Sequence, residues 1–316
     1  MSARGQFDLF GMPAGVQSAE AAATYRALRA RVPARIRLGT SSWSFPGWAG
    51  IVFDRPYSEQ ALARDGLAAY ARHPLLRAVS IDRTYYAPID AQAFATYAAA
   101  VPDDFRFLVK GDRLLTDPEA AAPAGTRFLD PEHAALAVVH PAVQGLADKL
   151  GAIVFQFSPR TAASHGGSDR FAGRLREFLD SLPAGPAYGV ELRTPALMTR
   201  AYAAALDATG TAHCYTVHSS MLSLRAQLER IPARANPLLL VRWMLREGLD
   251  YQGARERYAP FNRLVAEDPV TRDQIARASL DCAREELDAI ICINNKAEGS
   301  APLSAIRLAE AIAEGR

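Results

Sequence analysis

Eight short runs of β-branched and aromatic residues alternate with eight longer stretches of helical period. The runs are 36–42, 78–82, 106–110, 152–157, 188–193, 213–218, 238–243 and 289–294, and the helical stretches are 58–73, 90–100, 131–149, 169–182, 196–209, 221–230, 271–286 and 302–314. This alternation predicts parallel strands joined by crossover helices, and the count of eight predicts an α/β fold of the (β/α)8 TIM-barrel class. An open doubly wound sheet is the alternative, but no Gly-x-Gly-x-x-Gly follows any run.

Residues 1–34 are interpreted as an N-terminal arm with a short helix, and residues 35–316 as the barrel domain. Glycine, proline and polar residues dominate the first part of the arm, and Ser18 is the predicted N-cap of its helix. The N-terminus lacks the apolar segment of a signal peptide, and no run of about 18 apolar residues occurs. Three cysteines are too few for a disulfide framework. We therefore expect a cytoplasmic protein that does not enter a membrane.

The net charge is close to zero, since 36 basic residues face 34 acidic ones. This balance gives no strong signal for direct nucleic-acid binding or for a membrane surface. Hydrophobic residues make up 49% of the chain, which excludes a disordered or fibrous protein. Only three of the basic residues are lysines, Lys110, Lys149 and Lys296.

Polar residues end the predicted strands on one face. Residues two apart in a strand share a face, and one parity of every run is apolar, as the helix-covered outside of a barrel requires. The other parity ends in Ser41, Asp82, Lys110, Gln156, Glu191, Arg193, His218, Arg242 and Asn294. Barrel enzymes build their sites at the C-terminal ends of the strands, so we expect these side chains to meet at one mouth. The alternative is an ion-pair network that only closes the barrel.

The mouth residues favour acid/base chemistry, of hydrolase or lyase type, on a small anionic, phosphorylated or nucleotide-like ligand. The candidate catalytic residues are Asp82, Lys110, Glu191 and His218. We predict that Lys110 pairs with Asp82 or Glu191, although a desolvated lysine could also form a Schiff base. Glu191 and Arg193 could be a structural ion pair. Glycosidic chemistry between two carboxylates is a further alternative.

The candidate ligand-binding residues surround this catalytic set. They are Ser41, Trp43, Tyr85, Gln156, Arg193, Arg242, Asn294 and Asn295. Arginine suits bidentate contacts with carboxylates or phosphates, and the aromatic rings would stack on a ligand or plug the mouth. A small-residue turn after Asn295 predicts a phosphate site at the last helix, or simple capping of that helix by Ser300.

No cofactor and no metal are predicted. His218 with Asp82 and Glu191 could form a two-carboxylate, one-histidine metal site, but no His-x-x-x-His or Asp-x-His spacing supports it. His213 and His218 lie five apart in one strand, so they face opposite sides and cannot bind one metal together.

Several segments along the barrel carry a family resemblance. They are GTSSWSFPGWAG (39–50), TYY (84–86), FRFLVKGDRLLT (105–116), LGAIVFQFSP (150–159), YGVELR (188–193), LLVRW (239–243) and INNKAEGSAPLSAIRLAEAI (293–312). With them the chain resembles the DUF72 family, also called YecE-like, an uncharacterised barrel family. The resemblance implies the fold but no established reaction and no known cofactor.

Two positions depart from the pattern of that family. The family usually has Val-Glu-x-Asn in the second strand, where this chain has Val79-Ser80-Ile81-Asp82, so a carboxylate is missing at Ser80. Asp117 follows Thr116 where the family often has histidine. If these positions take part in chemistry, we expect altered or lost activity.

The N-terminal arm carries a possible docking peptide. Gln6, Leu9 and Phe10 resemble the Gln-x-x-Leu-Phe peptide with which bacterial proteins bind the sliding clamp. An exposed arm suits such a peptide, whose apolar residues fill a pocket of the partner. The alternative function is therefore a non-catalytic binding protein linked to DNA replication or repair. An apolar tail that packs on the barrel is the simpler interpretation.

Overall fold

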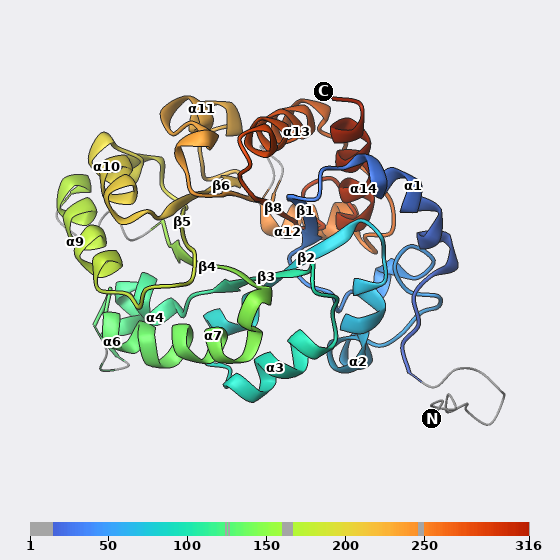
Figure 1. Ribbon diagram of the computed structural model, residues 1–316, viewed down its shortest axis with the longest axis horizontal. Helices are drawn as coiled ribbons and strands as arrows, with labels where there is room; N and C mark the ends of the chain where they lie inside the picture. The colour runs from blue at the N-terminus through green and yellow to red at the C-terminus, as the bar shows by residue number, and fades with distance from the viewer. Residues whose placement is uncertain (1–14, 124, 126, 160–166, 246–249, 316) are drawn as a thin grey trace.

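Eight parallel strands form a closed barrel in the order of the chain, as the alternation of the sequence predicted (Figure 1). The computed structural model describes residues 15–123, 125, 127–159, 167–245 and 250–315. The strands are β1 (Ile36–Thr40), β2 (Leu76–Ile81), β3 (Arg106–Lys110), β4 (Leu150–Phe157), β5 (Tyr188–Leu192), β6 (Ala212–Val217), β7 (Leu239–Trp243) and β8 (Ala289–Ile293). β1 pairs with β8 over five residues and closes the barrel.

Helices surround the barrel (Figure 1). They are α1 (Arg26–Arg31), α2 (Glu59–Ala71), α3 (Ala91–Ala99), α4 (Arg113–Thr116), α5 (Pro118–Ala121), α6 (Pro131–Ala134), α7 (His140–Leu146), α9 (Ser168–Asp180), α10 (Arg200–Thr209), α11 (Leu224–Arg230), α12 (Tyr251–Tyr258), α13 (Pro269–Arg284) and α14 (Ala301–Ala313). Short 3-10 turns are η1 (Glu20–Tyr25), η2 (Pro46–Trp48), η3 (Asp82–Tyr85), η5 (Ala147–Lys149), η6 (Pro195–Leu197) and η7 (Ala233–Ala235), and η4 (Ala135–Val139) is a π-helix. None of the helices in the described ranges is long and apolar enough to cross a membrane.

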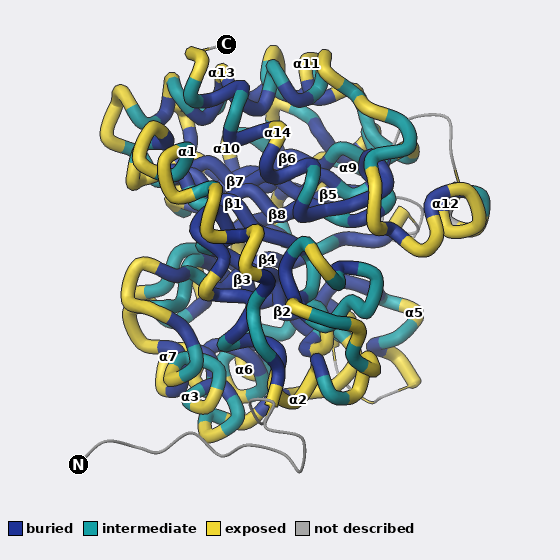
Figure 2. Tube along the Cα trace, turned by 90° about the vertical axis from the view of Figure 1, so that its right-hand side faces the viewer, coloured by how far each residue is buried: buried dark blue, intermediate teal, exposed yellow. Residues whose placement is uncertain are grey.

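The two parities of the strands build two separate cores. The outward parity packs against the helices in one large core, which includes Ile36, Val79, Phe107, Val190 and Ile291. The inward parity fills the barrel with a second core of Ala78, Leu108, Ala152, Val154, Ala212, Cys214, Leu238, Leu240, Ile290 and Cys292. Figure 2 shows the strands buried at the centre of the molecule. The alternation in the sequence therefore predicted the orientation of the strands, and the barrel interior is a packed core below the polar mouth.

Gly39 is a strand position at which an added side chain would meet the backbone of the next strand. A Cβ atom there would lie 1.9 Å from the carbonyl oxygen of Ala78 in the next strand. The register between β1 and β2 shifts between Leu38 and Gly39. Glycine therefore allows β1 to approach β2 closely just before the strand reaches the mouth.

The prediction of Ser18 as a helix N-cap was wrong. Ser18 forms a bridge with Phe53, and the first turn, η1, has Ala19 at its N-cap without a side-chain hydrogen bond. Backbone pairing with the loop after β1 therefore takes the place of capping. The arm then runs along the last helix, where Arg31 Nη2 donates to the carbonyl oxygen of Ala313 at 3.0 Å.

Several helical regions differ from the pattern in the sequence, and the short helices α4 and α5 were among those not predicted. The stretch 131–149 is not one helix but α6, the π-helix η4, α7 and η5. The π turn precedes Pro141, which has no backbone N–H to continue the α-helical bonds. α12, which follows β7 and precedes α13 in the chain, was not predicted. It projects from the body of the molecule (Figure 2). Its residues pack in a small core of their own with Leu245 and Phe261.

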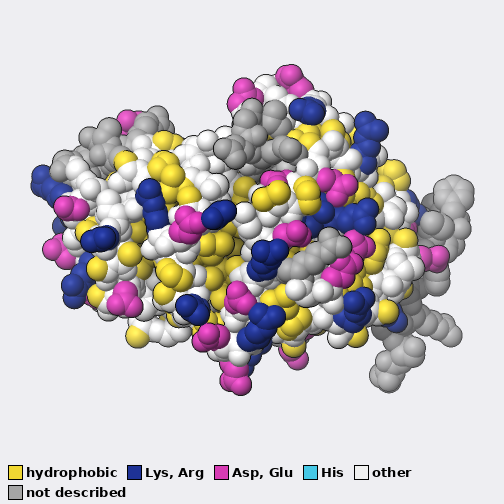
Figure 3. All heavy atoms as spheres, turned by 90° about the horizontal axis from the view of Figure 1, so that it is seen from above, with side chains coloured by type: hydrophobic (Ala, Val, Ile, Leu, Met, Phe, Trp, Pro, Cys, Tyr) yellow, Lys and Arg dark blue, Asp and Glu magenta, His cyan; other side chains and the backbone are white. Residues whose placement is uncertain are grey.

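The surface carries no dominant charge on the face seen in Figure 3, where acidic and basic side chains are interspersed. This agrees with the near balance of charges in the sequence.

Candidate functional site

Arg242 joins three strands at the C-terminal mouth of the barrel. Its Nη1 donates to Glu191 Oε2 at 2.7 Å, and its Nη2 donates to both oxygens of Asp82 at 2.6 and 2.9 Å. The guanidinium comes from β7, the glutamate from β5 and the aspartate from the end of β2. Burial would lower the pKa of Arg242, but Asp82 and Glu191 raise it. The polar strand ends thus converge on one mouth, and Arg242 is a permanent cation within it.

Glu191 is the buried anion of this network. Its side chain is 0% exposed, and Arg193 Nη2 lies 2.6 Å from Oε1, so the predicted Glu191–Arg193 ion pair is confirmed. Burial alone would raise the pKa of Glu191, but the cations Arg193, Arg242 and Lys110 outweigh it and lower the pKa to about 2. The carboxylate is therefore ionised throughout the physiological range.

Gln156, which lies in β4, links Arg193 and Arg242. Its Oε1 accepts from Arg193 Nη2 at 3.3 Å and from Arg242 Nη1 at 3.5 Å. The Nε atoms of both arginines are buried and have no acceptor in the described part of the chain. The network is thus connected, but not all of its buried donors are satisfied.

Lys110 lies beside the network without joining it. The lysine is 7% exposed, and its Nζ lies 3.6 Å from the ring centroid of Tyr85. Its amine forms no hydrogen bond or ion pair with any residue that the structure describes, so the predicted ion pair with Asp82 or Glu191 was wrong. The physical reason is competition, because the guanidinium of Arg242 occupies both carboxylates.

The environment of Lys110 makes its amine easier to deprotonate. Burial lowers its pKa to about 8, and Arg242 adds to that effect, while Asp82 and Glu191 oppose it. The amine is held against the face of Tyr85, which attracts a cation but cannot accept its proton. A group of this kind exchanges protons close to neutral pH.

Asp82 is the more accessible carboxylate. Its side chain is 32% exposed, and Ser80 Oγ donates to its Oδ1 at 2.5 Å. A hollow of about 170 Å³ beside it is lined by Ser41 and Trp43 among others. Trp43 itself is largely buried and packs edge-to-face on Tyr97, with ring centroids 5.2 Å apart. Ser80 and Asp82 therefore act as one unit, in which the hydroxyl holds the carboxylate toward Arg242.

His218 follows β6 on the other side of the mouth. Its Nδ1 accepts from the backbone N–H of Ser220 at 3.1 Å, so the neutral ring carries its proton on Nε2. Burial and Arg193 lower the pKa of His218 to about 4. It lines a cavity of about 330 Å³ together with Gln156, Arg193, Asn294 and Lys296. His218 is therefore a neutral hydrogen-bonding group at physiological pH.

The metal alternative for His218, Asp82 and Glu191 was wrong. Within the described ranges no three histidine, cysteine, aspartate or glutamate side chains come together as metal ligands would. His218 bonds to its own loop instead, and Arg242 holds both carboxylates. His213 faces away from the mouth, as predicted, and its Nδ1 lies 2.8 Å from the hydroxyl of Tyr202 outside the barrel.

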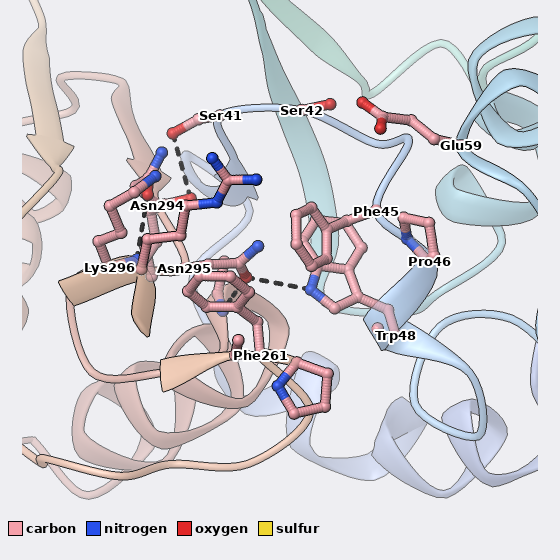
Figure 4. A pocket seen from close by; sticks show the side chains of 16 residues that line it. Ser41, Ser42, Phe45, Pro46, Trp48, Glu59, Phe261, Asn294, Asn295 and Lys296 are labelled. Carbon is pink, nitrogen blue, oxygen red and sulfur yellow. Dashed lines mark hydrogen bonds between the residues drawn. The ribbon is translucent and has the colours of Figure 1, made fainter. Parts of the chain in front are cut away.

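Asn294 and Asn295 follow β8 and line a cavity of about 630 Å³ next to the mouth (Figure 4). Asn295 Oδ1 accepts from Trp48 Nε1 at 3.0 Å and from the backbone N–H of Ala301 at 2.9 Å. Asn295 thus caps the start of α14. The predicted cap by Ser300 was wrong, since its buried hydroxyl has no partner in the described residues.

Some lining residues had no signal in the sequence pattern. Ser220 fixes the tautomer of His218, and Phe45, Phe261 and Lys296 line the cavity beside Asn295. Ser220 lies two residues beyond His218, so an examination of the loop could have found it. Phe261 follows the unpredicted α12, and nothing in the sequence pattern points to it. The expected partner-binding residues Gln6, Leu9 and Phe10 lie outside the described residues.

Comparison with known proteins agrees with this architecture. Residues 37–316 match the model of a family described as proteins of unknown function, DUF72. The chain belongs to the DUF72 family. No functionally curated protein sequence matches it significantly.

Solved structures of DUF72 members have the same fold. A DUF72 family protein from Enterococcus faecalis superposes with a TM-score of 0.63 at 19% sequence identity, over 88% of this chain and 95% of that one. A second crystal structure of the E. faecalis protein gives 0.58 at 17% identity, over 89% and 96%. A DUF72 member from Thermotoga maritima gives 0.60 at 18% identity, over 87% and 98%. At these identities the likeness shows the fold alone.

Proposed function

We propose that this DUF72 protein is an enzyme that acts on a small anionic substrate at the C-terminal mouth of its barrel, with Lys110 as the acid/base group. One observation carries the proposal. Two arginines pair with the two carboxylates of the mouth, while the Lys110 amine lies over the ring of Tyr85 and has no hydrogen bond or ion pair among the described residues. A buried amine without a counter-ion is costly unless a ligand uses it.

The charge count favours an anion. Lys110, Arg193 and Arg242 are three cations, and Asp82 and Glu191 are two anions, so the mouth has an excess of one positive charge. His218 is neutral because of its lowered pKa. A carboxylate or phosphate would balance this charge and provide acceptors for Arg193.

Each polar residue then has a distinct task. Lys110, with a pKa of about 8, would give or take a proton near neutral pH. His218 would donate a hydrogen bond from Nε2 to a substrate oxygen. Glu191, with a pKa of about 2, is too acidic to exchange protons and would position the two arginines. Asp82 is partly exposed and would contact the substrate while it holds Arg242.

A binding experiment tests the anion site. Inorganic phosphate is titrated calorimetrically into the wild-type protein, Lys110→Met and Lys149→Met. Lys149 lies before β4, at the opposite end of the barrel, so its variant removes the same charge elsewhere. We expect Lys110→Met to weaken phosphate binding at least tenfold and Lys149→Met to leave it unchanged. Equal binding by all three proteins, or no binding by any, would refute the proposal.

A second candidate function rests on the arm sequence. Gln6, Leu9 and Phe10 have the spacing of a clamp-docking peptide, which would make the protein a partner of the bacterial sliding clamp. A labelled peptide of residues 1–15 is titrated against the clamp, with a Leu9→Ala/Phe10→Ala peptide as the control. Saturable binding by the wild-type peptide alone would support this function. Equal binding by the two peptides, or no binding by either, would refute it.

A further inference from the structure

The cavity beside Asn295 adjoins the mouth but has a different lining. Its volume is about 630 Å³, against about 330 Å³ for the cavity beside His218, and the two share Asn294 and Lys296. Ser41 connects it to the hollow beside Asp82. A ligand bound in the mouth can therefore extend into this cavity.

Aromatic side chains form its walls. Phe45, from the loop after β1, meets Phe261, which follows α12, edge-to-face with ring centroids 5.2 Å apart. Phe45 also lies against Trp48 at 5.7 Å. Figure 4 shows these three rings around one side of the cavity. Such a wall favours a flat apolar group, because ring faces and edges give stacking and edge contacts.

Asn295 supplies a directed hydrogen-bond donor beside these rings. The residue is 8% exposed, and the two bonds to its Oδ1 fix which end of the amide is the nitrogen. Nδ2 has no acceptor among the described residues, and in Figure 4 it points toward the side of the cavity where Phe45 lies. A ligand acceptor there would satisfy this open donor.

We infer that this cavity binds a flat aromatic or heteroaromatic group of the substrate, with a hydrogen-bond acceptor facing Asn295 Nδ2. The inference rests on the proposed function, because the anionic group of the same substrate lies in the mouth against Lys110 and Arg193. The substrate class is then an anion that carries an aromatic ring. Arg255, Lys296 and Glu59 also line the cavity, so its charged side chains carry one net positive charge, which favours negative charge near that ring.

The test compares anions with and without a ring. Inorganic phosphate, phenyl phosphate and 2-naphthyl phosphate are titrated calorimetrically into the wild-type protein. We expect at least one aryl phosphate to bind about tenfold more tightly than inorganic phosphate. Phe45→Leu and, separately, Phe261→Leu should reduce this preference to about twofold without changing the affinity for inorganic phosphate.

The control variant is Tyr25→Leu. Tyr25 stacks on His73 at the N-terminal end of the barrel, so its loss should leave both affinities unchanged. Leucine is chosen because it retains apolar volume at each position. Two separate variants are made so that the test can be completed with either one if the other does not fold.

The outcomes separate this inference from the proposed function. If phosphate binds through Lys110 but no aryl phosphate binds better, or the preference survives the Phe45 and Phe261 substitutions, the cavity inference fails alone. If neither phosphate nor the aryl phosphates bind, both fail.

Discussion

Arg242 and Asp82 are 160 residues apart in the chain, yet Arg242 Nη2 bonds both oxygens of the Asp82 carboxylate. The contact ties the seventh strand to the second at the mouth of the barrel. Through Nη1 the same guanidinium reaches Glu191, so one side chain sets the positions of two acids. Rigid placement of this kind is what an acid/base site requires.

Glu191→Gln should lower the free energy of unfolding by about 3–5 kcal/mol, because it leaves two buried arginines without their common anion. Urea denaturation of the purified variant measures this loss. Glu229→Gln is the matched control, since Glu229 pairs with Arg225 on the exposed surface of α11, and it should behave like the wild type. Similar unfolding midpoints for the two variants would show that the network is not needed for the fold.

Acid should remove the contribution of Glu191 in a defined range. Its pKa falls from the ordinary 4.5 to about 2 on folding, so its stabilisation is complete above pH 4.5 and is lost as the pH falls toward 2. The linked free energy is roughly 3 kcal/mol. The unfolding free energies of the wild type and Glu191→Gln, measured from pH 6 to 2, should converge toward the acid end. A constant difference in unfolding free energy between the two proteins over that pH range would contradict the lowered pKa of Glu191.

Lys110 should titrate with a pKa of about 8, because burial and Arg242 disfavour its charged form. The chain has only three lysines, so isotope-labelled lysine gives an uncrowded NMR spectrum. Lys110→Met identifies the signal by its absence. In Tyr85→Leu, which removes the aromatic contact, the pKa should fall further, since a cation–π contact stabilises the charged amine. A Lys110 signal that titrates at the ordinary value of 10.5 would remove the acid/base role.

His218 should stay neutral from pH 8 to pH 5, since burial and Arg193 lower its pKa to about 4. Its ring-proton NMR shifts should be constant over that range and should change only below it. His218→Gln retains a hydrogen-bond donor, so we expect a modest loss of phosphate affinity, about twofold to fivefold. A titration near the ordinary 6.5 would mean that the ring takes up a proton and adds charge to the mouth.

The resemblance to the family pattern implies that this chain carries its strand-two carboxylate at Asp82 instead of at position 80. Ser80 and Asp82 share the inward face, and Asp82 reaches Arg242 while Ser80 bonds to Asp82. Asp82→Asn should therefore destabilise the protein by about 2–4 kcal/mol, because Arg242 loses one of its two anions. Ser80→Glu/Asp82→Asn, which restores the family pattern, should recover at least half of that loss in urea denaturation. A double variant no more stable than Asp82→Asn would show that the two positions are not interchangeable.

Strand count, parity and the common mouth could be predicted because each depends on local pattern. The outward apolar residues, such as Val79 and Ile291, repeat every second position in the sequence and lie in the outer core. The partners within the mouth could not be predicted in the same way. Whether Lys110 or Arg242 contacts an acid depends on side-chain length and on competition between the two cations. Arg242 pairs with both Asp82 and Glu191 because the two Nη atoms of its guanidinium reach both carboxylates at once.

The cavity residues show a second limit. Phe45 and Phe261 meet although 216 positions separate them, and one of them follows a helix that has no clear periodic signal. Ser18 and Ser300 were predicted as caps from residue type, but a backbone bridge and the Asn295 amide took those roles. Residue type indicates what a side chain can do, and tertiary packing decides whether it is needed.

The contact between Arg31 and the carbonyl oxygen of Ala313 brings the segment before β1 next to the end of α14. Together with the pairing of β1 and β8, this means that the two extremities of the barrel are neighbours in space. A brief glycine-serine linker can join them, and new termini can then be opened in an exposed crossover loop far from the mouth. A circularly permuted molecule of this kind would retain the Arg242 network.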